Sequence, residues 1–154
     1  NNMIKNSVLF FLVSVVFFAC EKDDFCTQNP VTPNLILRFY DDLDREALKN
    51  VPSFYVWSEG KDTIFENVST DSIYIPLNSL ATETVYNLST ENTISKFTVQ
   101  YTPKEEYVSR SCGYRVIFNE VTFTSNSGTW IKDFTPSDIT TINNQNTAHV
   151  QIFH

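Results

Sequence analysis

The sequence is poor in the residues that tight turns, phosphate loops and proton-transfer sites use most. Only three of its 154 residues are glycine and only two are histidine. The shortage of glycine predicts that two-residue hairpin turns of the primed types are rare and that longer loops join the strands. The sequence contains neither a glycine-rich phosphate-binding loop nor a Gly-x-Ser-x-Gly nucleophile motif. It therefore nominates no catalytic residue, and we expect no enzyme activity and no cofactor.

Basic residues are also scarce, because eleven Lys and Arg stand against eighteen Asp and Glu. The net charge is −7, and it becomes −8 once Lys5 is removed with the N-terminal segment discussed below. Nucleic-acid binding requires clusters of Lys and Arg, so this charge excludes a nucleic acid as the expected partner. Anionic lipid would repel the chain as well, so membrane attachment would have to rest on acyl chains.

The N-terminal segment has the order of an export signal. Lys5 precedes an apolar run over residues 8–18, and Ala19 and Cys20 follow. The run is about half of the ~20 residues that a spanning helix needs, which predicts a signal peptide over residues 1–19 rather than a membrane span. A cysteine directly after a small residue looks like a bacterial lipoprotein signal, with Cys20 as the lipidated first residue of the mature protein. The alternative is an ordinary signal peptide beside an accidental cysteine.

After a short acidic tether at residues 20–25, the dominant hydrophobic period is two, which predicts strands. Near Asn119 the apolar residues change from even to odd sequence positions, which predicts a bulge in the strand. Seven or eight short strands predict an all-β fold, an antiparallel immunoglobulin-like β-sandwich formed by one domain over residues 26–154. The clearest expected strands cover residues 34–40, 53–57, 72–77, 94–101, 114–123 and 148–153.

The remaining two cysteines, Cys26 and Cys112, form an even pair in an exported chain, and such a pair is more often bridged than free. We expect a disulfide that clips the segment before the first strand to the start of the strand at 114–123. A nucleophile or a metal ligand at Cys112 is the alternative, but no second thiol and no paired histidine accompanies it. Because six extended residues span at most ~20 Å, a bridged Cys26 would hold the domain close to the membrane.

Other candidate sites are weak. His149 and His154 are five residues apart on an expected strand, so they should lie on opposite faces and share no metal. The acidic cluster at residues 41–46 lacks the glycine and the spacing of a helix-loop-helix calcium site, and a solvated loop is the expected structure. We therefore predict no metal site.

Aromatic residues make up 14% of the chain, and one strand carries them on both faces. Tyr55 and Trp57 share one face, and Phe54 and Val56 share the other. One of these faces must be core. Tyr55 and Trp57 are the candidate ligand-contacting aromatics if their face is exposed, although an aromatic face of a sandwich is more often core.

Five segments are similar to one known family. They are Asp23-Asp24-Phe25-Cys26, residues 57–62, residues 71–77, the Val-Ser-Arg-Ser-Cys-Gly-Tyr-Arg block at 108–115, and residues 148–154. Together they resemble a family of Bacteroidota lipoproteins catalogued as domain of unknown function 6452. The likeness covers the whole chain after the signal peptide. It implies an exported lipoprotein with a β-rich domain, and it assigns no activity.

The implied lineage gives two further expectations. In Bacteroidota, Lys22-Asp23-Asp24 looks like the signal that sends lipoproteins to the outer leaflet, whereas a solvated linker on a protein facing the periplasm is the alternative. The triplets Asp62-Thr63-Ile64 and Asp71-Ser72-Ile73 resemble sites at which these bacteria attach O-glycans. Thr63 and Ser72 are therefore candidate O-glycosylation sites.

Two function classes follow from these observations. The first is a non-catalytic outer-membrane or surface lipoprotein that binds an envelope-protein partner or supports envelope structure. The second is an accessory module that binds a glycan or another small ligand, which a concave aromatic patch would favour. An enzyme would require clustered polar side chains in a cleft. A sandwich fold does not choose between these classes.

Overall fold

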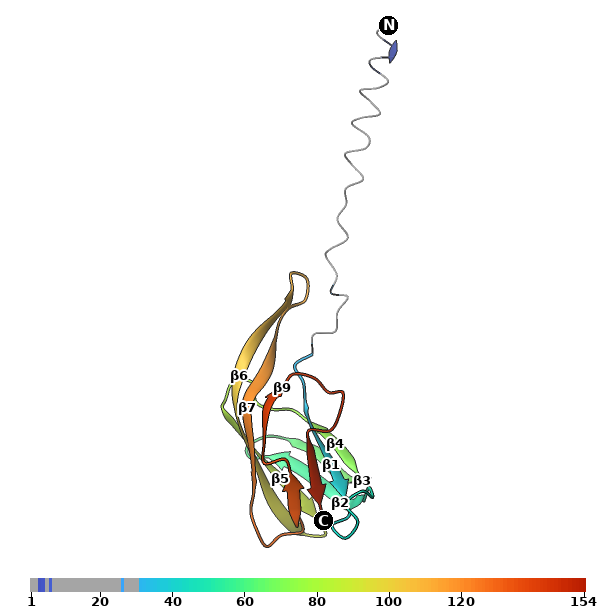
Figure 1. Ribbon diagram of the computed structural model, residues 1–154, viewed down its shortest axis with the longest axis vertical. Coiled ribbons are helices and arrows are strands. Elements are labelled where there is room, and N and C mark those ends of the chain that lie inside the picture. Colours follow the sequence, from blue (N-terminus) through green and yellow to red (C-terminus); the bar gives the residue numbers. More distant parts are fainter. Residues whose placement is uncertain (1–2, 5, 7–25, 27–30) are drawn as a thin grey trace.

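The structure, a computed structural model, describes residues 3, 4, 6, 26 and 31–154, and the last range folds into an all-β domain (Figure 1). None of the described residues forms a helix with the length and apolar character that a membrane span requires. Residues 31–154 contain ten strands, more than the seven or eight expected. They are β1 (Leu35–Tyr40), β2 (Val51–Ser58), β3 (Thr63–Thr70), β4 (Ser72–Ile75), β5 (Glu83–Thr90), β6 (Thr93–Ser109), β7 (Gly113–Ser125), β8 (Asp133–Thr135), β9 (Asp138–Ile142) and β10 (Val150–Phe153).

The strands form two sheets, one with the order β4-β1-β10-β8 and one with the order β3-β2-β5-β6-β7-β9. The predicted β-sandwich is confirmed, and its immunoglobulin-like type stays a prediction. The expectation of antiparallel pairing is wrong for one pair, because β10 runs parallel to β1 with Leu37 opposite Val150. Two parallel strands need a long connection, and here almost the whole chain lies between them.

The core lies between the two sheets and is rich in aromatic rings. Phe39 from β1 meets Phe54 from β2 edge to face, with ring centroids 5.3 Å apart, and Trp130 packs edge to face on Phe54 at 5.8 Å. The Trp130 indole N–H also donates a hydrogen bond to the Leu88 carbonyl at 2.9 Å. These contacts tie the long segment between β7 and β8 to both sheets, and all of the largest buried side chains are aromatic or aliphatic.

β6 and β7 form the longest hairpin, which extends beyond the sandwich as a two-stranded arm (Figure 1). The register between them shifts where Gln100 pairs with Thr122 and Thr102 with Asn119, so β7 carries one extra residue. Glu120, at this point, has a φ of 50°. The bulge predicted near Asn119 is therefore confirmed, and it explains why Phe118 and Val121 both reach the core.

Candidate functional site

The predicted disulfide is present and lies at the tip of the β6–β7 arm. Cys26 and Cys112 are bridged across 86 residues, with their Cα atoms 4.8 Å apart. The backbone N–H of Cys112 donates to the Ser109 hydroxyl at 3.0 Å, which orders the turn. The bridge therefore joins the segment before β1 to the start of β7. The predicted lipidation site Cys20, the predicted export signal Lys22-Asp23-Asp24 and the predicted tether at 20–25 lie outside the described residues.

An open cleft of about 570 Å³ lies beside the start of β5. The turn between β2 and β3 forms one wall, and the loop at residues 76–82 forms the other. Leu80 at the rim is 95% exposed, although it is a large apolar side chain. Lys61 and Glu83 also stand at the rim, and Lys96 neutralises the rim residue Glu59 at 2.9 Å. The apolar lining consists of Ile64, Pro76, Leu77, Val85 and Tyr86.

A closed set of hydrogen bonds fixes the wall that carries Leu80. The Asn78 N–H donates to the Thr84 hydroxyl at 3.1 Å, and the Tyr101 hydroxyl donates to the Asn78 carbonyl at 2.6 Å. The Thr84 hydroxyl lies 2.6 Å from the Tyr101 oxygen, and it donates there because the Tyr101 proton is already used. Both backbone groups of Asn78 are therefore satisfied by side chains of the large sheet. This arrangement fixes the position of the loop that forms this wall of the cleft.

Two buried tyrosines complete this wall. The Tyr86 hydroxyl donates to the Pro76 carbonyl. Burial raises the pKa of Tyr86, and the neighbouring Tyr101 adds to the effect. Burial raises the pKa of Tyr101 as well. Both phenols therefore stay protonated at neutral pH and act as donors that position the loop, which is a structural role.

The structure resolves which face of β2 is core. Phe54 and Val56 are fully buried, whereas Tyr55 is 37% exposed and Trp57 is half-buried on the outer face of the large sheet. Tyr55 pairs with Ser89, and Trp57 pairs with Asn87, both from β5. The candidate aromatics therefore face outward, but neither of them lines the cleft beside β5.

The two candidate O-glycosylation residues differ in accessibility. Thr63, the first residue of β3, is exposed, whereas Ser72, the first residue of β4, is half-buried. The Ser72 backbone N–H and carbonyl both bond to the Thr70 hydroxyl, at 3.2 and 2.9 Å. Thr63 is thus the more accessible acceptor, and glycosylation of either stays a prediction.

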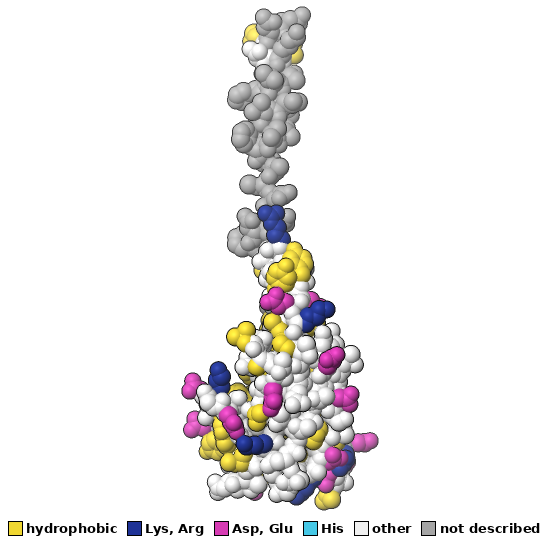
Figure 2. Space-filling model, turned by 90° about the vertical axis from the view of Figure 1, so that its left-hand side faces the viewer, with side chains coloured by type: hydrophobic (Ala, Val, Ile, Leu, Met, Phe, Trp, Pro, Cys, Tyr) yellow, Lys and Arg dark blue, Asp and Glu magenta, His cyan; other side chains and the backbone are white. Residues whose placement is uncertain are grey.

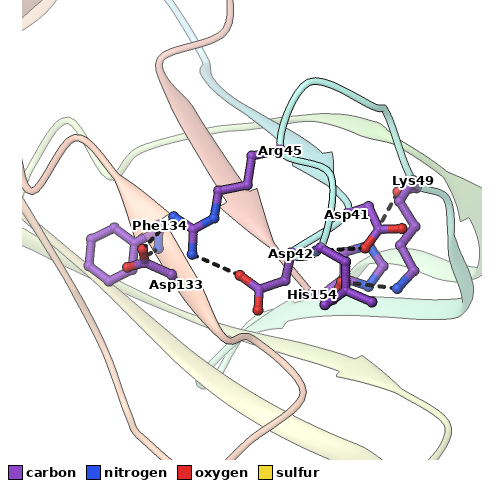
Figure 3. A network of polar contacts seen from close by, with 8 residues as sticks. Asp41, Asp42, Arg45, Lys49, Asp133, Phe134 and His154 are labelled. Atoms are coloured by element: carbon purple, nitrogen blue, oxygen red, sulfur yellow. Dashed lines mark hydrogen bonds and ion pairs between the residues drawn. The ribbon is translucent and has the colours of Figure 1, made fainter.

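The acidic cluster after β1 forms part of a polar network at the end of the sandwich opposite the arm (Figures 1 and 3). Arg45 bonds to Asp42 and to Asp133, both at 2.8 Å, and its guanidinium lies 4.2 Å from the centroid of the Phe153 ring. Hydrogen bonds from Arg45 and from the Phe134 N–H hold the pKa of the Asp133 carboxyl below its usual range. Among residues 31–154, no group of three carboxylate, thiol or imidazole side chains is arranged for a metal ion.

The two histidines serve separate structural contacts. Nδ1 of His149 accepts the Ile36 N–H at 2.9 Å, so its Nε2 carries the proton and donates to the Asn144 carbonyl at 2.8 Å. Nε2 of His154 bonds to the Lys49 carbonyl at 3.2 Å. Burial lowers the pKa of both imidazoles, so both are neutral at pH 7.

Sequence reasoning did not single out Leu80 or the residues that fix its loop. The available signal was a lone leucine inside the polar segment Asn-Ser-Leu-Ala-Thr at 78–82, where no buried position is expected. No local sequence pattern indicates that Thr84 and Tyr101 fix the loop of Leu80, because their meeting depends on the pairing of β5 with β6.

Comparison with known proteins gives one match. Residues 53–154, more than half of the chain, match the family described as a family of unknown function, DUF6452. Neither a curated protein nor a solved structure matches the chain. Residues 1–52, with Cys20 and Cys26, lie outside the matched range. The chain belongs to the DUF6452 family of unknown function.

Proposed function

We propose that the protein is a non-catalytic, lipid-anchored outer-membrane protein of a Bacteroidota-type envelope that binds a protein partner at the cleft beside β5. The observation that carries this proposal is Leu80, which a fixed loop holds almost fully exposed at the rim of an apolar cleft. The position of Leu80 beside a preformed, mostly apolar hollow gives a partner both an apolar anchor and a pocket to fill. The resemblance of residues 1–24 to a lipoprotein signal supports the anchor.

The contacts of the side chains whose pKa values are shifted support a binding role over a catalytic one. Tyr86, Tyr101, His149 and His154 all have perturbed pKa values, and each is engaged by backbone groups of its own fold. Tyr86 and Tyr101 fix the loop at residues 76–82, whereas His149 contacts the Asn144 carbonyl and His154 contacts the Lys49 carbonyl. The four side chains therefore do not converge on one reacting centre. Such perturbations are those of structural networks.

The partner site can be tested with a matched pair of leucines. Leu80 and Leu43 are 95% and 96% exposed, and Leu43 lies in the loop after β1, at the end opposite the arm. A photo-reactive amino acid placed at Leu80 should give a cross-linked adduct in intact cells, and the same group at Leu43 should not. Leu80→Asp should weaken an isolated complex about ten- to a hundredfold, since burying one leucine contributes about 1.5–3 kcal/mol. Equal adducts at both positions would contradict the proposed site.

We further propose that the domain faces the cell surface, because Lys22-Asp23-Asp24 resembles an outer-leaflet export signal. Protease added to intact cells should then remove the domain, while a periplasmic control protein survives. Protection until the outer membrane is permeabilised would place the domain in the periplasm instead. Mass analysis of the N-terminal peptide tests acylation of Cys20 separately.

Glycan binding is a second candidate, and the outward orientation of Tyr55 beside Trp57 favours it. Aromatic rings exposed on the face of a sheet can stack on sugars. Affinity electrophoresis through cell-surface polysaccharides should then show retardation that Tyr55→Ala abolishes. Tyr74→Ala is the matched control, because Tyr74 is 49% exposed on β4 of the other sheet. Unretarded protein, or equal loss in both variants, would rule against this candidate.

A further inference from the structure

The tip of the β6–β7 arm carries an exposed pair of aromatic rings. Tyr107 and Tyr114 are directly opposite each other in the hairpin, with ring centroids 5.4 Å apart in an edge-to-face arrangement. They are 60% and 66% exposed. The arm here consists of two strands only, since β5 and β9 pair with the lower parts of β6 and β7. The aromatic pair therefore projects from the body into its surroundings.

The disulfide ties this tip to the N-terminal segment. Tyr114 is two residues from Cys112, and Cys112 is bridged to Cys26. Further along, the Val116 N–H donates to the Thr32 hydroxyl at 3.0 Å, so the described chain before β1 lies beside β7. The arm is thus the part of the domain to which any N-terminal anchor is attached.

The remaining chain between anchor and bridge is short. Cys26 is the sixth residue after Cys20, so six residue lengths of chain join the two. Fully extended, they span at most ~20 Å, and a flexible chain of that length has a typical end-to-end distance of roughly 13 Å. The headgroup layer on one side of a bilayer is itself about 5–7 Å thick. An anchor at Cys20 would therefore hold the arm tip at or next to the headgroups.

The charge of the arm suits this position. Residues 104–115 contain three basic residues and two acidic ones, and Arg110 lies in the turn at the tip. Removing these from the eleven basic and eighteen acidic residues of the whole chain leaves eight basic against sixteen acidic residues elsewhere. Figure 2 shows hydrophobic side chains gathered at the narrow end of the body, with basic and acidic side chains around them. The rest of the domain would be repelled by an anionic surface, whereas the arm would not.

We propose that the arm tip is a membrane-contacting element, with Tyr107, Tyr114 and Arg110 lying in the lipid headgroup layer. The proposal rests on the lipid anchor at Cys20 proposed above. Tyrosine suits this layer because its ring is apolar and its hydroxyl remains hydrated. The arm then works as a second point of contact, and the end of the sandwich with the Arg45 network faces away from the membrane (Figures 1 and 3).

The test uses the acylated protein, purified from membranes and reconstituted in phosphatidylcholine–phosphatidylglycerol vesicles. Tyr114→Trp places an indole at the tip, and Leu43→Trp is the control at the far end, where the side chain is 96% exposed. Spectra are taken as differences from the parent protein, which contains Trp57 and Trp130. We expect the Tyr114→Trp emission to shift to shorter wavelength and to be quenched by lipids brominated high on the acyl chain. The Leu43→Trp emission should do neither.

The outcomes separate this inference from the anchor on which it rests. Protein that is acylated and floats with vesicles, but whose Tyr114→Trp emission is unquenched, would overturn the membrane contact and leave the anchor intact. Quenching of both indoles alike would also overturn it, because the domain would then lie flat on the lipid. Protein without an acyl group at Cys20 that does not float would overturn the anchor, and the inference with it.

Discussion

Replacing both bridged cysteines, Cys26→Ser with Cys112→Ser, should strongly destabilise the domain. The bridge closes a loop with a sequence separation of 86 residues. In the chain-entropy model, a loop of this length removes unfolded-state entropy worth about 4.5 kcal/mol at 25 °C. Unfolding of roughly 130 residues has an entropy near 0.27 kcal/mol per kelvin, so the midpoint of thermal unfolding should fall by about 17 °C. The effect acts on the unfolded chain and needs no change in the folded core.

Urea unfolding, followed by the fluorescence of Trp57 and Trp130, measures this loss of unfolding free energy. The variant and the reduced parent protein should unfold at the same urea concentration, well below the oxidised parent. Ser111→Ala is the matched control, because Ser111 is an exposed residue of the same turn and should change stability by less than about 0.5 kcal/mol. The slope with urea should also rise, because an open unfolded chain exposes more surface.

A loss below about 1 kcal/mol would refute this reasoning. It would mean that the unfolded chain is already compact around these residues, so that the bridge restricts little. Thiol alkylation before unfolding would show that the bridge was formed in the parent protein. With the bridge confirmed, a small loss could not be attributed to its absence.

Three further predictions concern the cleft, pH and the core. Tyr101→Phe leaves the Asn78 carbonyl with only the longer bond from the Ala81 N–H at 3.3 Å and deprives the buried Thr84 hydroxyl of its acceptor. It should lower the unfolding free energy by about 1–3 kcal/mol, measured in urea. Burial lowers the pKa of His149 from its usual 6.5, so the unfolded state binds the proton more readily. Stability should therefore fall as the pH drops below about 6.5, and His149→Gln should flatten that fall in thermal melts at pH 7 and 5. Phe54→Ala should cost about 3–5 kcal/mol, whereas its neighbour Tyr55→Ala, with an exposed side chain, should cost less than about 1 kcal/mol.

The fold was predicted best where hydrophobic alternation is regular. In the first half of β6, Phe97, Val99 and Tyr101 alternate with polar neighbours, and these side chains are core in the structure. The central strand β5 gave a weaker signal because Asn87 and Ser89 are buried as well, although they point to the outer face. On that face Asn87 and Ser89 pair with the larger Trp57 and Tyr55 of β2, and β6 flanks them on the other side, so burial along β5 is near-continuous.

Glycine scarcity also proved a limited guide to the turns. The hairpin between β5 and β6 turns through Glu91 and Asn92, which have φ angles of 50° and 66°. Thr90 pairs with Thr93 across it, so this is a two-residue turn of the primed kind without glycine. Asparagine tolerates the left-handed region, and eight paired residues on each strand hold Glu91 there. Pairing of the long strands thus overrode the preference of primed turns for glycine.

One of the candidate sites could be predicted from the sequence, and another needed the structure. The disulfide could be predicted because the expected lipidation of Cys20 leaves only two cysteines, and two cysteines can pair in only one way. For Tyr55 and Trp57 the sequence established only that they share a face. The structure was needed to show that Phe54, on the other face, is the one that meets the opposing sheet.

The sequence by itself determined the class of fold, the acidic surface, the cysteine pair and the alternation of inner and outer side chains. These properties depend on composition and on neighbours a few residues apart. Tertiary structure alone decided that β10 enters beside β1 in parallel, that Asn78, Thr84 and Tyr101 meet around one loop, and that the arm presents Tyr107 and Tyr114 at its tip. The physical reason is that a strand's hydrophobic period shows which side needs covering. Which distant strand covers it depends on the summed pairing and packing energies of the whole chain.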